Sequence, residues 1–156
     1  MRSERGTTAY SGDFSVRILG RTAIPKPEAA SYQGACESLI FPTLKGQYGV
    51  LPHHRNMIAA VIPGTLRYKL PGQEERIAAV SEGMIKIEDN EVLILVDSAE
   101  RPEDIDANRA KRAADAAKEA MLQKRSMQEY HVAEANLARA INRLKVKNHN
   151  RDLTRK

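Results

Sequence analysis

The chain has 156 residues, of which 42% are hydrophobic and 29% charged, and its formal net charge is +5. This length accommodates one medium domain, or one small domain with an appendage, and the hydrophobic content suffices for an ordinary core. No run of about 18 apolar residues is present to span a bilayer, and the polar N-terminus lacks the apolar stretch of a secretory signal. We therefore expect a soluble protein that stays in the compartment where it is made.

The front of the chain reads as strands preceded by a tail. Residues 1–12 have too little apolar content to hold them against a core, so we expect them to be disordered. Apolar and polar positions alternate over residues 14–18, as in a strand with one solvated face. Residues 20–34 contain two prolines and no periodicity, which predicts a long connection between the first two strands.

Further short apolar runs follow, separated by proline and glycine turn signals. Residues 84–88 alternate, Asp89-Asn90 reads as a two-residue hairpin turn, and the continuous apolar run 92–96 predicts a strand buried on both faces. Many short strands without intervening helices favour an antiparallel sandwich or a flattened barrel. The other strands of this domain are expected at residues 47–51, 57–62, 65–70 and 76–80.

At residues 98–102 the pattern changes to an alanine-rich, charged, helical sequence. Pro102 suits a first helical position, and the acidic residues after it favour a helix N-terminus, so a helix is expected over 102–123. Residues 126–129 match a capping box, which predicts the start of a second helix. Apolar residues then recur at steps of three and four, giving one stripe: Tyr130, Ala133, Leu137, Ile141 and Leu144.

Two helices with a short link between them most simply form an antiparallel hairpin. The predicted fold class is therefore α+β: an N-terminal antiparallel β-sandwich over residues 13–98 followed by a C-terminal two-helix antiparallel hairpin over 99–147, with a flexible tail at 148–156. The hairpin stripe is mostly alanine, and burying alanine returns little free energy. We therefore expect its contact with the sandwich to be weak enough to break.

Positive charge is concentrated in the rear segment. From Arg101 onward there are 14 Lys and Arg against 8 Asp and Glu, so this part carries +6 while the first hundred residues carry −1. Such a segment favours an acidic protein surface, a nucleotide or a nucleic acid as its partner. A basic helical-hairpin nucleic-acid-binding module is the alternative, although aromatic residues are only 4% and none lies among the rear arginines to stack on bases.

The residues that bear chemistry do not group into a catalytic pattern. The single cysteine, Cys36, has no cysteine or histidine nearby and is interpreted as a small buried filler. His53 and His54 are adjacent, so on an extended chain they point in different directions and do not share a metal ion. We find no Ser/His/Asp grouping, no paired carboxylates in an expected cleft and no phosphate loop. The sequence therefore predicts neither catalytic residues nor a metal site.

Residues 46–54 (GQYGVLPHH) and 63–68 (PGTLRY) resemble the glycine-glycine-leucine-proline-x-histidine signature region of the epsilon subunits of bacterial F-type ATP synthases, the delta subunits of mitochondria. The resemblance continues through 81–84, 99–106 and 139–144, in order along the chain. His53 stands where the family usually has glycine. The residues that match the family's structural motif, the first two of which we expect to allow positive backbone angles in a turn, are Gly46, Gly49, Leu51, Pro52, His54, Gly64 and Gly83.

The resemblance implies a rotor subunit that performs no chemistry. The sandwich would bind the gamma subunit and rest on the ring of c subunits, so that proton-driven rotation reaches the catalytic head. The helical arm would leave the enzyme free when folded back, and would inhibit ATP hydrolysis when extended toward the catalytic alpha and beta subunits. The protein would be peripheral, held by the complex at the cytoplasmic face of the bacterial cell membrane, and would bind no nucleic acid.

The resemblance also implies a nucleotide ligand. Residues 105–110 (IDANRA) match the family's ATP motif, so ATP is expected as a regulatory ligand although no cofactor is required. Arginines one helical turn apart on one face can both reach phosphate oxygens. Tight-binding relatives have a further arginine where this chain has Ala116, which implies weak affinity or none. Matched position by position, the candidate ATP-binding residues are Glu100, Ile105, Asp106, Arg109, Arg139 and Arg143.

Overall fold

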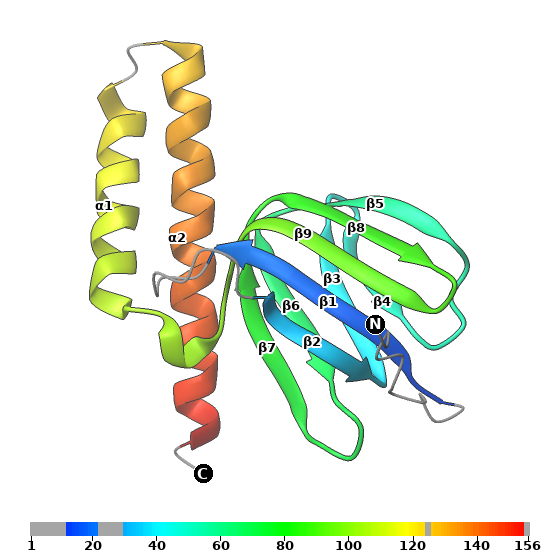
Figure 1. Cartoon of the computed structure of the whole chain (residues 1–156). Helices are drawn as coiled ribbons and strands as arrows, with labels where there is room; N and C mark the ends of the chain where they lie inside the picture. The colour runs from blue at the N-terminus through cyan, green and yellow to red at the C-terminus, as the bar shows by residue number, and fades with distance from the viewer. Residues whose placement is uncertain (1–11, 22–29, 124–125, 155–156) are drawn as a thin grey trace, which may run out of the picture.

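The computed structural model describes residues 12–21, 30–123 and 126–154 (Figure 1). Within these residues, nine strands precede a short 3₁₀ helix and two α-helices. The strands are β1 (Phe14–Arg21), β2 (Ala30–Cys36), β3 (Ser38–Thr43), β4 (Gly46–Val50), β5 (Met57–Val61), β6 (Gly64–Lys69), β7 (Glu75–Val80), β8 (Gly83–Glu88) and β9 (Glu91–Glu100). The helices are η1 (Pro102–Asp104), α1 (Ala107–Gln123) and α2 (Met127–Thr154).

The strands form two layers joined by the long strand β9. Sheet A has the order β2-β1-β9-β8-β5, and sheet B has the order β4-β3-β6-β7. The last residues of β9 cross to sheet B, where Ala99 and Glu100 pair with β7. The predicted sandwich is confirmed, with one exception to its antiparallel pairing: β1 and β9 run parallel. This crossing places Glu100 at the junction between the sandwich and the helices.

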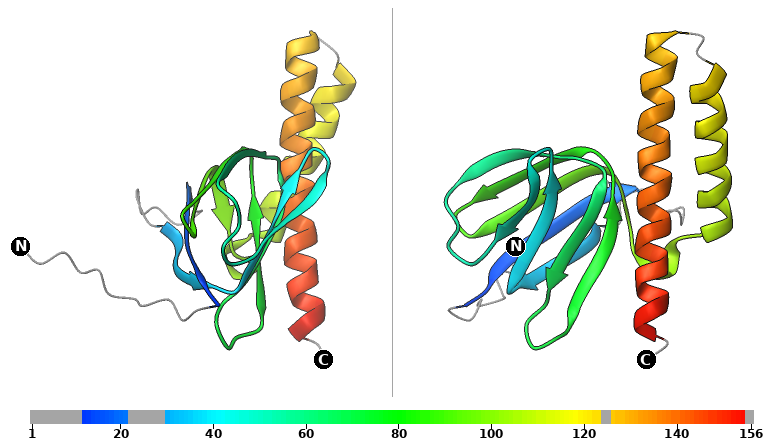
Figure 2. Two further views of the ribbon diagram at one scale, coloured as in Figure 1. Left: turned by 90° about the vertical axis from the view of Figure 1, so that its right-hand side faces the viewer. Right: turned by 180° about the vertical axis from the view of Figure 1, so that it is seen from behind.

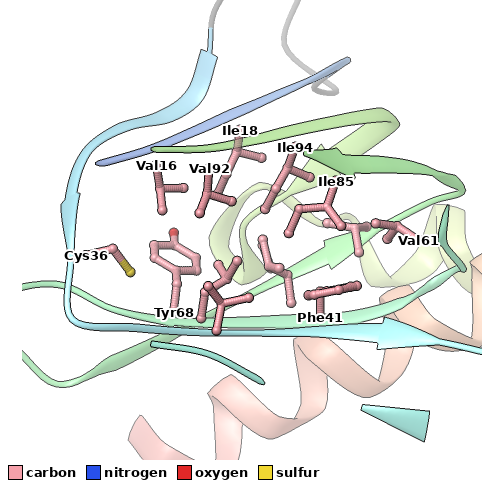
Figure 3. Close-up of a cluster of buried hydrophobic side chains, with 14 of the residues drawn as sticks. Val16, Ile18, Cys36, Phe41, Val61, Tyr68, Ile85, Val92 and Ile94 are labelled. Carbon is pink, nitrogen blue, oxygen red and sulfur yellow. The ribbon is translucent and has the colours of Figure 1, made fainter. Parts of the chain in front are cut away.

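The core lies between the two sheets (Figure 3). Each strand turns alternate residues inward, so β1 contributes the fully buried Val16 and Ile18, as its alternation predicts. Phe41 of β3 and Ile94 of β9 are also 0% exposed. Large aliphatic and aromatic side chains therefore stabilise the sandwich, at about 1.5–3 kcal/mol for each fully buried one.

Two expectations for the sandwich are wrong. Residues 20–34 are not one long connection, because Ala30–Cys36 forms strand β2 beside β1. The small and polar residues of β2 do not alternate clearly between apolar and polar, so the sequence pattern gives no sign of a strand. The strand forms because its backbone hydrogen-bonds with β1. The run 92–96 is not buried on both faces, since Leu95 is 38% exposed on the outer face of sheet A. The helices pack on the other sheet. The tail expected at 1–12 lies almost wholly outside the described residues.

Several turns contain residues with positive φ, and within the family motif this is true of Gly46 but not of Gly49. Asp89 and Asn90 have φ of 49° and 64°, which confirms the two-residue hairpin turn. Gly46 has φ of 114°, whereas Gly49 lies inside β4 without a positive φ, so its expected turn role is wrong. His53 adopts φ of 62°, a conformation that glycine reaches without strain.

The helical segment is hereafter called the arm (residues 102–154). Its first α-helix begins at Ala107 instead of residue 102, and its second continues to Thr154, past the predicted end of the hairpin at residue 147. Residues 102–104 form η1, and α1 begins at Ala107 because Asp106 caps it: Asp106 Oδ1 accepts the backbone N–H of Arg109 at 3.1 Å. Ser126 Oγ accepts the backbone N–H of Glu129, also at 3.1 Å, as the capping box predicts. The tail expected to be flexible at 148–156 is helical through Thr154, because no proline or glycine interrupts α2.

In the hairpin, α2 lies between α1 and the sandwich (Figures 1 and 2). Of the predicted stripe, Ala133 is buried and Tyr130, Leu137 and Leu144 are half-buried, but Ile141 is 37% exposed. The C-terminal half of α2 instead buries Asn142 and Val146 against β6, β7 and η1. In the part of the chain that the structure describes, neither helix is long and apolar enough to cross a membrane.

Candidate functional site

A cavity of about 970 Å³ lies between the two helices of the arm and one end of the sandwich. The end of β7, the end of β9 and one face of each helix line it. Alanines of α1 form much of one wall, including Ala113, Ala116 and Ala120, and three arginines from the two helices reach its surface. The size is in the range of small-ligand pockets.

Arg143 and Glu100 form the ion pair at the base of this cavity. Arg143 Nε lies 2.8 Å from Glu100 Oε2, and Arg143 Nη2 bonds the other carboxylate oxygen, so the pair is bidentate. Glu100 is only 4% exposed, because β9 delivers it to the sandwich edge and α2 covers it. A guanidinium that already holds a carboxylate in this geometry is oriented but occupied.

Arg139, one turn earlier on α2, forms a second ion pair with the sandwich. Its Nη1 bonds Glu82 at the β7–β8 turn, and its Nη2 donates to Asn136 Oδ1 at 2.6 Å. Partial burial alone would raise the pKa of Glu82, but a backbone hydrogen bond and the Arg139 contact outweigh it and lower this pKa. Both sequence-predicted arginines of α2 therefore face the sandwich with carboxylate partners.

The remaining candidates do not all meet at the cavity. Arg109 of α1 is exposed and lines it. Asp106 is engaged at the α1 N-terminus through one carboxylate oxygen. Ile105 is buried with Ala79 and Val146 in a small apolar cluster beneath the arm. The structure thus brings Glu100, Arg109, Arg139 and Arg143 together, and leaves Asp106 and Ile105 outside the lining.

The charges that line the cavity balance. Arg109, Arg139 and Arg143 contribute three positive charges, and three carboxylates on the same lining oppose them: Asp97, Glu100 and Glu129. An anion entering this space must therefore compete with carboxylates for the guanidinium groups. The resemblance indicated the arginines and Glu100 but not Glu82, the partner of Arg139, because Glu82 carries no signal that distinguishes it from other surface carboxylates.

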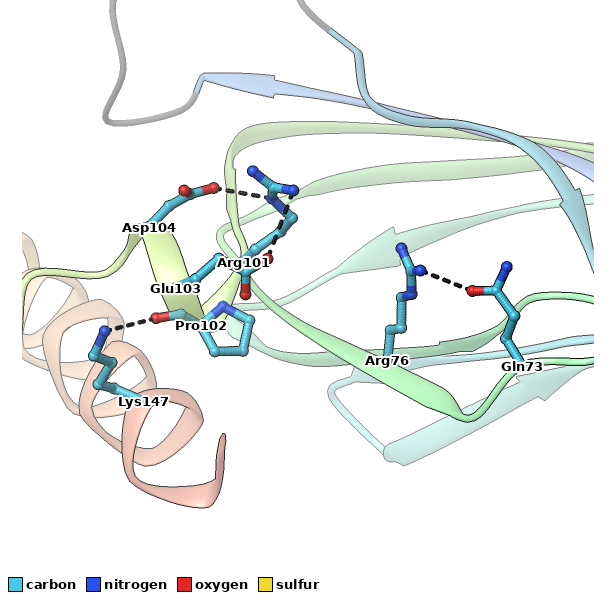
Figure 4. Close-up of polar contacts among 7 residues, drawn as sticks. All are labelled: Gln73, Arg76, Arg101, Pro102, Glu103, Asp104 and Lys147. Atoms are coloured by element: carbon cyan, nitrogen blue, oxygen red, sulfur yellow. Dashed lines mark hydrogen bonds and ion pairs between the residues drawn. The ribbon is translucent and has the colours of Figure 1, made fainter. Parts of the chain in front are cut away.

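Polar contacts also fix the foot of the arm. Lys147 Nζ donates to the Pro102 carbonyl oxygen at 3.0 Å, and Arg101 Nε bonds Asp104 Oδ2 at 3.0 Å, which braces η1 (Figure 4). On the same helix, Asn142 bonds the first two residues of β6. Asn142 was not predicted from the sequence, since an asparagine on a helix is ordinarily solvated and nothing in the spacing marked this one.

His54 and Cys36 have structural partners. Tyr48 and His54 are joined by a 3.1 Å hydrogen bond to Nε2, and His54 Nδ1 lies 2.8 Å from the Arg55 carbonyl, so both ring nitrogens are engaged. Burial raises the pKa of the Cys36 thiol to about 11, and its Sγ bonds the Ser38 carbonyl, as expected of a core filler. Among the described residues, no group of histidine, cysteine and carboxylate side chains is arranged to hold a metal ion.

Two family patterns match this chain and together cover most of it. Residues 14–102 match the β-sandwich domain of the ATP synthase delta/epsilon chain, and residues 103–148 match its long α-helix domain. The boundary between the two patterns falls at η1, where the sandwich ends in the structure. The last residues of α2 extend past the second pattern.

Individual relatives agree with both patterns. An ATP synthase epsilon chain of Ruminiclostridium cellulolyticum is 41% identical over 125 residues, covering 80% of this chain and 92% of that protein. One of Ruminococcus albus is 33% identical and covers 86% of this chain and 96% of its own. A chain in the Euglena gracilis mitochondrial ATP synthase, solved as an OSCP/F1/c-ring assembly, has the same fold, with a TM-score of 0.62 at 20% identity, covering 88% of this chain and 85% of that one.

Proposed function

Because this chain belongs to the ATP synthase delta/epsilon chain family, we propose that it is a non-catalytic rotor subunit of a proton-translocating F-type ATP synthase. In this proposal the sandwich docks on the gamma subunit and the c ring and transmits rotation between them. The arm regulates ATP hydrolysis. The complex holds the protein at the cytoplasmic face of the cell membrane.

The docking proposal rests on one observation, a row of exposed apolar residues on the outer face of sheet A. Ala60, Met84 and Leu95 lie side by side across β5, β8 and β9, and Ile58 of β5 is 66% exposed nearby. The arm packs on sheet B, so it leaves this row uncovered. Contiguous exposed apolar residues on a sheet favour a protein partner. We assign this row to the gamma subunit.

The end of the sandwich offers a smaller contact. Leu44, in the turn between β3 and β4, is 87% exposed. A large apolar side chain at the tip of a tight hairpin projects from the body of the molecule. We assign this tip to the c ring.

The arm supplies the regulatory part of the proposal. Beyond the ion pairs at the cavity, α2 carries exposed basic residues such as Lys145, which suit acidic groups on the catalytic subunits. Lys124 and Arg125 also contribute to the basic rear segment of the sequence, and both lie outside the described residues. Extension of the arm would exchange its contacts with the sandwich for contacts with the alpha and beta subunits, and those ion pairs would weaken with salt.

ATP is proposed as a ligand that favours the folded arm. The cavity has a suitable volume, and Arg109, Arg139 and Arg143 reach it from both helices. Phosphates would have to displace Glu82 and Glu100 from two of these arginines, and Ala116 adds no further charge, so we expect weak binding. Titration of the full chain with millimolar ATP, followed by NMR shifts of the arm, tests this. Shifts that vanish in the Arg143→Gln variant support it, and an absence of shifts contradicts it.

Recovery from membranes tests the docking proposal most directly. Wild-type protein should be recovered in stoichiometric amounts with the gamma and c subunits. Leu95→Glu places a charge within the apolar row and should abolish that recovery. Leu122→Glu makes the same change at an 82% exposed position of the arm and should leave recovery intact. Equal recovery of both variants would contradict the assigned surface.

The inhibitory role of the arm is tested separately in the assembled enzyme. A chain that ends at Arg101 retains all nine strands and lacks the arm. Enzyme assembled with this truncated chain should hydrolyse ATP faster than enzyme with the full chain. Identical hydrolysis rates would remove inhibition from the proposal and leave docking unaffected.

A further inference from the structure

Asn142 differs from the other residues between α2 and the sandwich because its side chain is neutral, polar and buried. It is 9% exposed. Its Nδ2 donates to the Gly64 carbonyl oxygen at 2.6 Å, and its Oδ1 accepts a hydrogen bond from the Thr65 hydroxyl at 3.2 Å. Both ends of one amide therefore bond two successive residues at the start of β6. Burying such a group without partners is unfavourable, so this contact favours one placement of the helix.

Neighbouring placements of α2 would lose both hydrogen bonds. The residues one turn before and after Asn142 on the same face are Ala138 and Val146. If the helix slid by one turn, an apolar side chain would face Gly64 and Thr65. A shift of one residue would rotate the amide by about 100° away from the strand. The side chains of α2 therefore form the hydrogen bonds with Gly64 and Thr65 of β6 in only one position of the helix along the strand.

The ion pairs of the arm select a position less sharply. Arg143–Glu100 and Arg139–Glu82 act through long side chains with many rotamers, so even the bidentate Arg143 pair can be kept while the helix backbone shifts slightly. The Arg139 pair is also partly exposed, so salt weakens it. Apolar contact of Val146 is non-directional.

From these contacts we infer that Asn142 is the positioning residue that sets where the arm docks, with Gly64 and Thr65 of β6 as its receiving site. The ion pairs and Val146 add attraction at that place. The inference rests on the proposed function only for the consequence of release, which is inhibition. Docking itself is a property of the chain alone and can be measured without the enzyme.

The experiment uses the full chain carrying two dyes, on Ile58→Cys in the sandwich and Leu122→Cys in the arm, both at exposed positions. The buried Cys36, with its thiol pKa raised to about 11, stays unlabelled at neutral pH. Single-molecule energy transfer then gives the ratio of released to docked arms. Asn142→Ala should raise that ratio about thirtyfold, since two net hydrogen bonds are lost. Asn148→Ala, an exposed asparagine on the same helix, should leave it unchanged.

Two further variants distinguish positioning from space filling. Asn142→Asp keeps the shape but replaces the donor with an oxygen that faces the Gly64 carbonyl, so it should release the arm at least as strongly as alanine. Thr65→Val should have a smaller effect, and adding it to Asn142→Ala should change little, because one interaction is removed twice. In 1 M NaCl, where the partly exposed Arg139–Glu82 pair is screened, the wild type should stay docked and Asn142→Ala should release further.

The inference is overturned if Asn142→Asp and Thr65→Val both dock like the wild type in 1 M salt. If Asn142→Ala does not fold, as judged by the melting of the strands, Thr65→Val decides, because it alters only a half-buried hydroxyl. Hydrolysis by the assembled enzyme is recorded separately. Release of the arm without a fall in hydrolysis contradicts the proposed inhibition and leaves the positioning role of Asn142 standing.

Discussion

The sandwich and the arm of this chain are stabilised by different kinds of contact. Between the sheets lie fully buried residues such as Phe41, Ile85 and Ile94, packed on all sides. Beneath the arm lie one small apolar cluster, the Asn142 hydrogen bonds and ion pairs. Loss of a large core side chain costs about 3–5 kcal/mol, whereas each arm contact contributes about 1 kcal/mol. One chain can therefore contain a rigid platform and a part that detaches at modest cost.

The largest effect is expected in the sandwich, from Gly83→Ala. A Cβ at Gly83 would lie 2.0 Å from the Leu95 carbonyl oxygen, which is backbone and cannot yield without moving β9. Unfolding free energy should fall by about 3 kcal/mol, the upper range for overpacking. Gly49→Ala is the matched control, because nothing lies within 4 Å of its Cβ position. Equal urea midpoints for the two variants would contradict this packing.

The next effect is expected at the foot of the arm, from Val146→Ala. Val146 is 1% exposed and packs with Ala79 and Ile105, so the change removes about 1.5 kcal/mol of apolar burial. The released fraction of the arm should rise roughly tenfold while the melting of the sandwich stays unchanged. Energy transfer in the dye-labelled chain measures the released fraction, and circular dichroism measures the melting of the sandwich. A coupled loss of both would show that the two regions unfold as one unit.

A smaller, local effect is expected from Ser126→Ala at the tip of the arm. Its hydroxyl oxygen caps α2 by accepting the backbone N–H of Glu129, and such caps are worth about 1 kcal/mol. Exchange of the first amides of α2 should become faster, without change in the strands. Ser15→Ala, at an exposed position of β1, serves as the control.

The smallest effect concerns Cys36 and appears only at high pH. Its pKa is raised by burial, so the folded state holds the thiol proton more tightly than the unfolded state does. This contribution is fully present below the ordinary pKa of 9.0 and is lost as pH rises toward about 11. Urea midpoints of wild type should therefore fall more between pH 8 and pH 10.5 than those of Cys36→Ala. Parallel slopes would show that the thiol is accessible when folded.

The elements that were predicted correctly from the sequence are those that a local pattern determines. Alternation in 14–18, the Asp89-Asn90 turn and the capping box at Ser126 depend on neighbouring residues, and each is found as expected. The sequence did not predict the elements that depend on pairing between strands far apart in the chain. The strand β2 exists because β1 lies beside it, and the parallel pairing of β1 with β9 is set by the whole sandwich.

The candidate site follows the same division. The resemblance to the family pointed to residues 105–110 and to the two arginines of α2, and Arg109, Arg139 and Arg143 do meet at one cavity. Glu82, the contact between Arg143 and the candidate Glu100, and the role of Asn142 were not predicted, because these contacts join residues 43 to 78 positions apart. The continuous apolar run 92–96 was predicted to be a strand with both faces buried. Its outer residue Leu95 instead forms part of the exposed row that we assign to a partner.

Native-state hydrogen exchange of the full chain tests the central claim, that the arm separates from an intact sandwich. Amides of β8 and β9 should exchange only through global unfolding, and their protection should equal the free energy of unfolding. Amides of α1 should exchange several kcal/mol more easily, through an opening that is nearly independent of denaturant at low concentration. Protection of α1 equal to that of the strands, with the same denaturant dependence, would contradict the account.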